Sequence, residues 1–354
     1  MKQMKVIFIV DDSMLYLMAA QKALEDTYKV VALSSAAAMF ETLNTVKPDL
    51  IVLDIIMPDM DGLEALRKLK ANVRYASIPV IFLTGKKDDV TEALGFELGA
   101  VDFITKPFSK SVFINRIKTH LDIEDIIRER TERLLKLQGG LVSILANMVE
   151  NRDTLTGKHI ERTTKYMEVL LEAMFEQGAY ATELSTWDFE STIWSARLHD
   201  IGKIAVTDLI LNKPEQLTDK EFSIMKTHTV EGERLIDAVI KESGDVPFLQ
   251  NAKLFAGSHH ERWDGTGYPR GLKGAAIPLQ GRIMAIADVY DALVSERPYK
   301  SAFSHEKAVD IILESSGTNF DPLIVDVFYK VHSLFEGASE MELNIAAPNS
   351  LPVI

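Results

Sequence analysis

The residues best suited to chemistry lie in the stretch HHERWDGTGYP, which runs from His259 to Pro269. Two adjacent imidazoles before a glycine-rich turn are poor core residues and good metal ligands. Histidine is scarce in the chain, with 8 among 354 residues. Further candidate ligands lie on either side of the stretch: His159, His199, Asp200, His228 and Asp288. A mixed set of nitrogen and carboxylate donors suits Mn, Fe, Zn or Ni, and it indicates a polynuclear metal site and hence a hydrolase.

A second group of polar residues follows short apolar runs in the first 120 residues. The runs are Val6–Val10, Leu50–Leu53, Pro79–Leu83 and Val101–Ile104, and the residues after them are Asp11 with Asp12, Asp54, Thr84, and Thr105 with Lys106. Such runs, alternating with amphipathic stretches, predict a doubly wound α/β domain with a parallel sheet. The polar residues should then meet at the carboxyl edge of that sheet. Carboxylates without imidazole favour Mg²⁺, and a nearby lysine could hold a phosphoryl oxygen.

Residues 1–120 resemble the receiver domain of bacterial response regulators. The resemblance rests on Asp11–Asp12, Asp54 with Met57–Pro58, Thr84 and Lys106–Pro107. It implies that Asp54 is the phosphoacceptor and that Asp11, Asp12 and Asp54 bind Mg²⁺. It also implies that Thr84 and Lys106 sense the phosphoryl group, and that the bond before Pro107 is cis. A cognate sensor histidine kinase would be the partner that phosphorylates the domain.

A helix is predicted after this domain. Apolar residues recur at spacings of three and four between Phe108 and Leu137, and Gln138–Gly139–Gly140 is expected to end the helix. It is either a short coiled coil that makes a homodimer or an ordinary capping helix followed by a linker. No strand pattern recurs beyond Gly140, so an all-α domain is expected there. The predicted organisation is a receiver domain at 1–124, a helical linker at 125–139, an all-α domain at 140–340 and a flexible tail at 341–354.

Residues 140–335 resemble the HD-GYP phosphodiesterases, which hydrolyse the bacterial second messenger cyclic di-GMP. The resemblance rests on Arg152–Asp153, Thr156–Gly157, His159 with Arg162, His199–Lys203, His228 with Gly232, the HHERWDGTGYP stretch, Ala287–Leu293 and Arg297–Tyr299. It implies two metals held by His159, His199, Asp200, His228, His259, His260 and Asp288, with Asp200 as the bridge. It implies catalytic roles for Asp200 and Lys203. The implied substrate contacts are Lys203, Tyr268, Asp291, Arg297 and Lys300.

One position departs from part of that family. Some members hold a third metal with a glutamate four residues before the first motif histidine. This chain has Leu155 there, which cannot bind a metal. Two metals are therefore expected.

Composition excludes several other classes of protein. The net charge of −13 argues against nucleic-acid binding, and no basic recognition helix follows the receiver-like domain. The absence of cysteine excludes disulfides and fits a reducing cytoplasm. The apolar run before Asp11 is too short for a signal sequence, and no stretch approaches the roughly 20 apolar residues of a membrane span.

The sequence therefore predicts a response regulator whose phosphorylation at Asp54 controls hydrolysis of cyclic di-GMP to pGpG, GMP or both. Two alternatives stay open. The chain could be a receptor that binds the nucleotide with little turnover and acts through partners, or a phosphohydrolase for a different nucleotide.

Overall fold

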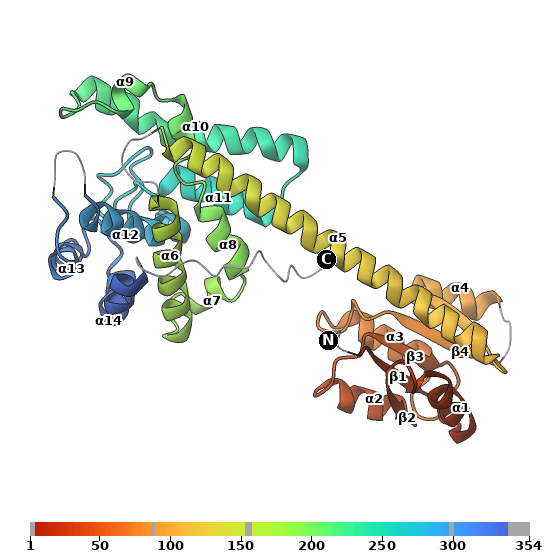
Figure 1. Ribbon diagram of the computed structural model, residues 1–354. Helices are drawn as coiled ribbons and strands as arrows, with labels where there is room; N and C mark the ends of the chain where they lie inside the picture. Colours follow the sequence, from red (N-terminus) through yellow and green to blue (C-terminus); the bar gives the residue numbers. More distant parts are fainter. Residues whose placement is uncertain (1–3, 86–88, 153–157, 297–300, 339–354) are drawn as a thin grey trace. The chain divides into compact units, whose positions relative to one another are not determined.

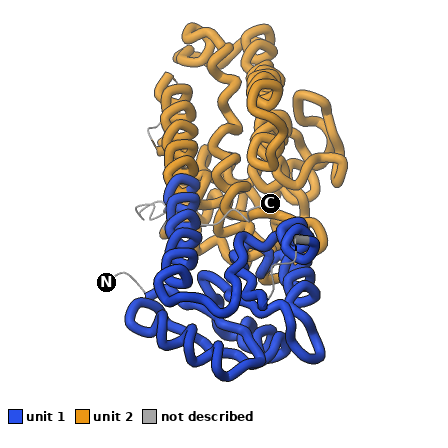
Figure 2. The backbone as a smooth tube through the Cα atoms, turned by 90° about the vertical axis from the view of Figure 1, so that its right-hand side faces the viewer, with its two compact units in different colours: residues 1–131, 351–354 blue, residues 132–350 orange. Residues whose placement is uncertain are grey.

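The computed structural model describes residues 4–85, 89–152, 158–296 and 301–338. The expected tail at 341–354 lies outside these ranges, as do Asp153, Leu155, Thr156, Gly157, Arg297 and Lys300. The chain divides into two compact units, with the boundary after Thr131 (Figure 2). Each unit has its own core and is described by itself.

The first unit contains a parallel five-stranded sheet with the order β2-β1-β3-β4-β5 (Figure 1). The strands are β1 (Val6–Val10), β2 (Lys29–Leu33), β3 (Leu50–Asp54), β4 (Val80–Thr84) and β5 (Asp102–Thr105). The helices between them are α1 (Met14–Leu24), α2 (Ala36–Leu43), α3 (Gly62–Ala71) and α4 (Asp89–Glu97). This arrangement confirms the predicted doubly wound α/β fold.

Successive side chains of a strand point to opposite faces of the sheet, so an apolar strand presents apolar side chains on both faces. Helices cover both of these faces. In β1, Phe8 and Val10 belong to a core cluster that includes Met39 of α2. Ile7 and Ile9 belong to a separate cluster that includes Leu17 of α1. Burial on both sides explains why the central strands are continuous apolar runs.

Helix α5 spans Lys110–Glu150, 41 residues, and the predicted break at Gln138–Gly140 is wrong. Gly139 is buried, and a Cβ at this position would lie 3.2 Å from the ring of Trp194. The glycine therefore lets the helix approach that indole, and the cost of about 1 kcal/mol for glycine in a helix does not stop it. Tertiary packing has overridden the local propensity.

The second unit is helical, as expected, and within its described residues the only β pairing is an isolated bridge between Ser316 and Phe320. Its elements are α6 (His159–Glu176), α7 (Ala181–Leu184), α8 (Phe189–Ala196), η1 (Ile201–Ala205), α9 (Asp208–Leu211), α10 (Asp219–Ser243), α11 (Pro247–Ser258), η2 (Gly274–Ala276), α12 (Leu279–Val294), α13 (His305–Glu314) and α14 (Pro322–Ala338). One large apolar cluster joins α6, α12, α13 and α14. This cluster packs together α6 and α12, the helices that carry His159 and Asp288.

Among the described residues, no helix has the length and apolar character needed to cross a membrane.

Candidate metal centre

Three carboxylates and a lysine meet at the carboxyl edge of the receiver sheet. Oxygens of Asp11, Asp12 and Asp54 all lie within 4.8 Å of one another. The Lys106 Nζ lies 2.5 Å from Asp11 Oδ2 and 3.0 Å from Asp54 Oδ1. Burial raises the pKa of Asp54, Lys106 opposes this shift, and Asp11 and Asp12 add to it. A cation among these oxygens would relieve the repulsion, so the donor set fits Mg²⁺.

The remaining receiver residues lie at the same edge. Thr84 is buried at the end of β4, and the Lys106–Pro107 bond is cis, as the resemblance implies. The sequence interpretation missed Tyr16, whose ring centre lies 4.5 Å from Lys106 Nζ. Tyr16 occupies the first turn of α1, four residues beyond Asp12, and that position was the available signal.

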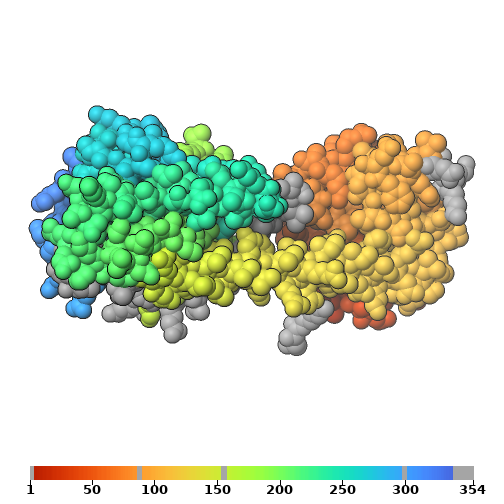
Figure 3. All heavy atoms as spheres, turned by 90° about the horizontal axis from the view of Figure 1, so that it is seen from above, coloured from red at the N-terminus to blue at the C-terminus, as the bar shows by residue number. Residues whose placement is uncertain are grey.

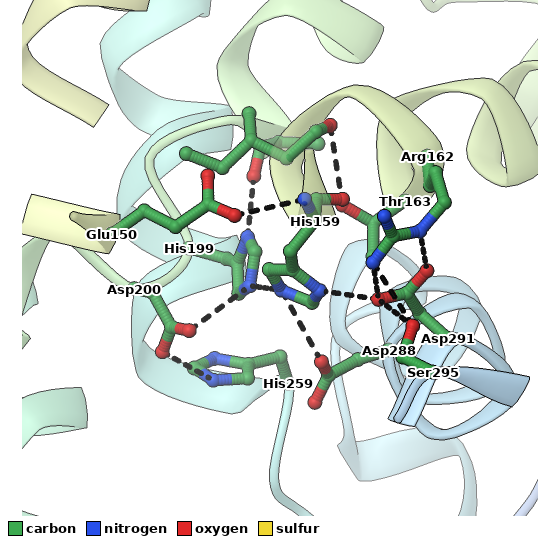
Figure 4. A network of polar contacts seen from close by, with 12 residues as sticks. Glu150, His159, Arg162, Thr163, His199, Asp200, His259, Asp288, Asp291 and Ser295 are labelled. Carbon is green, nitrogen blue, oxygen red and sulfur yellow. Dashed lines mark hydrogen bonds and ion pairs between the residues drawn. The ribbon is translucent and has the colours of Figure 1, made fainter. Parts of the chain in front are cut away.

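The second unit brings its seven candidate ligands together in two groups. One group contains Asp200, His228, His259 and His260, and the other contains His159, His199 and Asp288. Within each group, the candidate donor atoms lie within 4.8 Å of one another. Figure 4 shows His159, His199, Asp200, His259 and Asp288 directed toward one another from separate segments of the chain. The His199–Asp200 pair, three helices (α6, α10 and α12) and the segment after α11 thus converge on one place.

The tautomers of the histidines follow from their hydrogen bonds. His199, His228 and His259 each donate from Nδ1 to a backbone carbonyl one helical turn earlier, at 2.9, 2.7 and 2.9 Å. A carbonyl only accepts, so Nδ1 holds the proton and Nε2 of the neutral ring is bare. The Nε2 atoms of His228 and His259 nevertheless lie 3.4 Å apart, as do those of His159 and His199. The bare nitrogens of His228 and His259 repel at this distance unless their lone pairs share a cation, so the donor set fits bound metal.

Asp200 joins the two groups. Its Oδ2 lies 3.4 Å from His199 Nε2, and its Oδ1 lies 3.4 Å from His228 Nε2. Oδ1 is buried and has no hydrogen-bond donor. Burial opposes ionisation, but Lys203 and His199 hold the pKa of Asp200 well below its ordinary value. An ionised carboxylate with an orphaned buried oxygen between two ligand groups has the chemistry of a bridging ligand.

Asp291 positions His159. The Asp291 side chain is only 2% exposed, and its Oδ2 accepts from His159 Nδ1 at 2.8 Å. Arg162 donates from Nε to Oδ1 at 2.6 Å and from Nη2 to Oδ2 at 2.9 Å (Figure 4). Although burial opposes it, the hydrogen bond to Asp291 raises the pKa of His159. These contacts are those of a residue that orients a metal ligand, whereas the substrate contact expected from the sequence stays a prediction.

Burial favours the neutral form of two other imidazoles, those of His228 and His260, as ligation requires. It lowers the pKa of His228 to about 4, and it lowers that of His260 well below the ordinary value, with His259 adding to the effect. The ring of Tyr268 lies 4.8 Å from that of His260 at 35° between planes. Burial raises the pKa of Tyr268, so its hydroxyl stays protonated.

A glycine sets the position of the HD segment. A Cβ on Gly202 would lie 1.9 Å from the His228 carbonyl oxygen and 2.4 Å from Gly232 N. Only glycine lets η1 lie directly against α10, and this contact brings Asp200 to His228. Lys203, the next residue, points back to Asp200 with 2.8 Å between Nζ and Oδ2.

The ligand groups open into a cavity of about 270 Å³, which Lys203 and Tyr268 also line. Sequence reasoning missed the contribution of α5 to its wall. Glu150 lines the cavity and accepts a hydrogen bond from the His159 backbone N–H at 2.8 Å. Arg152 donates to the carbonyl oxygens of Lys203, Ile204 and Val206 at 3.3, 2.9 and 3.0 Å. Glu150 at the end of α5 and Arg152 in the turn after it therefore form hydrogen bonds with two segments that carry candidate ligands.

Comparisons with known proteins agree with this architecture. Residues 7–118 match the response regulator receiver domain and residues 143–324 match the HD domain. A Vibrio cholerae protein named probable cyclic di-GMP phosphodiesterase is 42% identical over 91% of this chain and 76% of its own. The Xanthomonas campestris cyclic di-GMP phosphodiesterase response regulator RpfG is 34% identical over 95% of this chain and 88% of its own. A Vibrio cholerae 3'3'-cGAMP-specific phosphodiesterase 2 is 37% identical over 53% of this chain and 33% of its own.

The two domain matches occur in the same order as the two structural units, and the first two relatives are matched over most of their length. The chain therefore belongs to the response regulators of the cyclic di-GMP phosphodiesterase family, with a receiver domain followed by an HD domain.

Proposed function

We propose that this protein hydrolyses cyclic di-GMP to pGpG, GMP or both, under the control of phosphorylation at Asp54. One observation carries the proposal. Two groups of bare imidazole nitrogens and carboxylates converge on a cavity, and the Asp200 carboxylate lies between them. The relatives named cyclic di-GMP phosphodiesterases support the choice of substrate.

The donor set suits two divalent transition metals, and Mn, Fe, Zn and Ni are all compatible with it. Such a pair would supply an acidic bound water and neutralise the phosphodiester oxygens. Asp200 would hold both ions, and Lys203 would leave Asp200 to bind a phosphate oxygen. Tyr268 would border a guanine beside His260. Arg297 and Lys300, outside the described residues, are retained as proposed phosphate contacts.

The receiver domain would take its phosphoryl group from a cognate sensor histidine kinase. Asp11, Asp12 and Asp54 would bind Mg²⁺, whose charge offsets that of the incoming group. Lys106 already contacts Asp54, and with Thr84 it would respond to the phosphoryl oxygens.

The partner that we propose for α5 is the same helix of a second copy. Apolar residues follow a strict heptad at Ile127, Leu134, Leu141 and Met148, interleaved with Ile123, Arg130, Leu137 and Ile144. The seven apolar members are 45–65% exposed, and parts of α5 lie on the face seen in Figure 3 (yellow). A period of 3.5 residues matches a coiled-coil seam, which an identical helix complements. Leu137→Glu should yield monomers by light scattering, whereas the exposed off-seam change Lys136→Glu should not.

The proposal is tested by elemental analysis of the purified protein followed by hydrolysis assays with added Mn²⁺ or Fe²⁺. The substrates are cyclic di-GMP and 3'3'-cGAMP, each with and without beryllofluoride as a phosphoryl mimic. Two metals per chain, guanylate products and a change with beryllofluoride are the expected results, and Asp200→Ala should lose metals and activity together. Tight binding of cyclic di-GMP without product under every condition would instead identify a receptor. Faster turnover of 3'3'-cGAMP would overturn the choice of substrate.

A further inference from the structure

Arg197 is a buried cation without a carboxylate partner. It follows α8, two residues before His199, and it is 9% exposed. Across the described ranges of the chain, no aspartate or glutamate forms a salt bridge with it. Among the described residues, the other buried arginine is Arg282, and it is paired with Asp321 at 2.8 Å. Glu161 acts on Arg197 through its charge but forms no salt bridge with it. Burying a charge without a contacting counter-ion is costly, so an arginine kept in this state calls for an anion that the free protein lacks.

The side chain is held in place by neutral groups. Its Nη1 donates to Ser143 Oγ at 2.7 Å, and its guanidinium carbon lies 4.1 Å from the centre of the Trp194 ring. Nε is buried without an acceptor. A guanidinium has five N–H donors, and among the residues that the structure describes only Ser143 accepts from one of them. These contacts orient the guanidinium fork of Arg197 and leave most of its N–H donors without an acceptor among the described residues.

Arg197 lines the same cavity as Asp200 and Lys203. Its anchor Ser143 precedes Glu150 on α5 by seven residues, about 10 Å along the helix, and Glu150 contacts His159. The anchor therefore lies about two helical turns of α5 away from the Glu150–His159 contact. A cyclic dinucleotide has two phosphodiesters, and only one of them can lie at the metal ligands during cleavage. The other enters an acidic protein and needs its own cation.

We propose that Arg197 binds the second, uncleaved phosphodiester of the cyclic dinucleotide through its free guanidinium donors, an inference that rests on the proposed function. Arginine suits this role because its planar fork matches two phosphate oxygens. Ser143 and Trp194 act as positioning residues for the fork. The same cation would favour substrates with two phosphodiesters over those with one.

The test uses the full chain loaded with metal and compares two ligands. Cyclic di-GMP has two phosphodiesters, whereas the linear dinucleotide GpG has both guanines and only one. Arg197→Met should raise KM for cyclic di-GMP by about 10- to 100-fold, the range for a lost charged hydrogen bond, and should raise the inhibition constant of GpG less than threefold. Arg197→Lys should fall between wild type and Arg197→Met. The matched control is Arg234→Met, because Arg234 is a 69% exposed arginine on α10.

Metal content and melting temperature are measured on every variant. Equal losses for cyclic di-GMP and GpG would overturn the inference, because they would indicate guanine recognition or a structural role. If Arg197→Met fails to fold, Ser143→Ala removes the anchor and keeps the charge, and an unchanged KM in that variant and in Arg197→Lys would equally overturn it. Wild-type protein that holds metals but does not hydrolyse cyclic di-GMP would refute the proposed function, a different outcome from an active wild type with an unaffected Arg197→Met.

Discussion

Replacing Asp291 by asparagine should weaken metal binding without removing any ligand. The Asp291 carboxylate accepts from His159 Nδ1 on Oδ2 at 2.8 Å and from Arg162 Nε on Oδ1 at 2.6 Å, and Arg162 Nη2 also donates to Oδ2 at 2.9 Å. An asparagine side chain has the same shape, but one of its two polar ends donates. It can therefore accept from His159 Nδ1 or from Arg162 Nε, and the other of these two donors faces an N–H group.

Two separate losses follow from this change. Removing the partner that orients a metal-binding histidine typically costs about 10- to 100-fold in metal affinity. Removing one member of a buried ion pair costs about 3–5 kcal/mol of unfolding free energy. The lower end applies here, because Arg162 is 18% exposed and also donates to Ser295 Oγ at 3.0 Å. At about 2–4 °C per kcal/mol for a unit of this size, the melting temperature should fall by roughly 6–12 °C.

The assay is competition between the protein and a chelator of known affinity, with bound metal read by elemental analysis and unfolding followed by calorimetry. Asp310→Asn is the matched control, since Asp310 is exposed on α13. Activity should fall with metal occupancy and recover in part when excess metal is supplied. Wild-type metal affinity in folded Asp291→Asn would refute the reasoning, because it would mean that the hydrogen bond does not orient the His159 ring.

Three further predictions concern the receiver and α5. Asp54→Ala should keep both metals and basal hydrolysis but lose any response to beryllofluoride, and a response that persisted would exclude Asp54 as the acceptor. For Asp102, burial opposes ionisation, but Arg116 lowers its pKa below 3.8. That carboxylate therefore stabilises the folded state above pH 3.8, and its contribution is lost as the pH falls through its lower pKa in the folded state. Asp102→Asn should lower the unfolding free energy by about 1 kcal/mol at pH 7 and by little in strong acid. Hydrogen exchange of the β5 amides measures this difference. Gly139→Leu should lower the unfolding free energy by about 1–3 kcal/mol, because the new side chain collides with the Trp194 indole. Gly140→Ala should raise it by up to about 1 kcal/mol, because nothing lies within 4 Å of the new Cβ. Equal effects of the two changes in urea unfolding would contradict the packing argument.

The central strands were predictable because burial on both faces makes their sequences apolar throughout. Val6–Val10 is β1 residue for residue, and Leu50–Leu53 lacks only Asp54 of β3. Strand β2, Lys29–Leu33, was missed although Val30–Leu33 is an apolar run of four residues. It lies at the edge of the sheet, where its residues are exposed or half-buried, and no polar side chain of the candidate site follows it.

The site shows a similar limit. Motif spacing indicated which residues converge, because each of them needs a specific side chain for its chemistry. It could not reveal Glu150 or Arg197, whose roles depend on where α5 passes. Nor could it reveal that carbonyls orient His199, His228 and His259 or that Asp291 orients His159, because those hydrogen bonds arise only when the helices are placed. The glycine pair in α5 led to the wrong prediction of a helix end for a related reason. The packing of the Trp194 indole against Gly139 cannot be read from the sequence.

The contacts of α5 give a physical basis for control of the metal centre. Glu150 binds the backbone of His159, which belongs to one ligand group. Arg152 binds the carbonyls that follow Asp200, which belongs to the other group. A small displacement of α5 would therefore pull on the two groups unequally and change the distance between them. Hydrolysis by a metal pair bound there would depend on that distance, so a helix shift of about 1–2 Å, typical of switching proteins, would be enough to alter turnover without unfolding either unit.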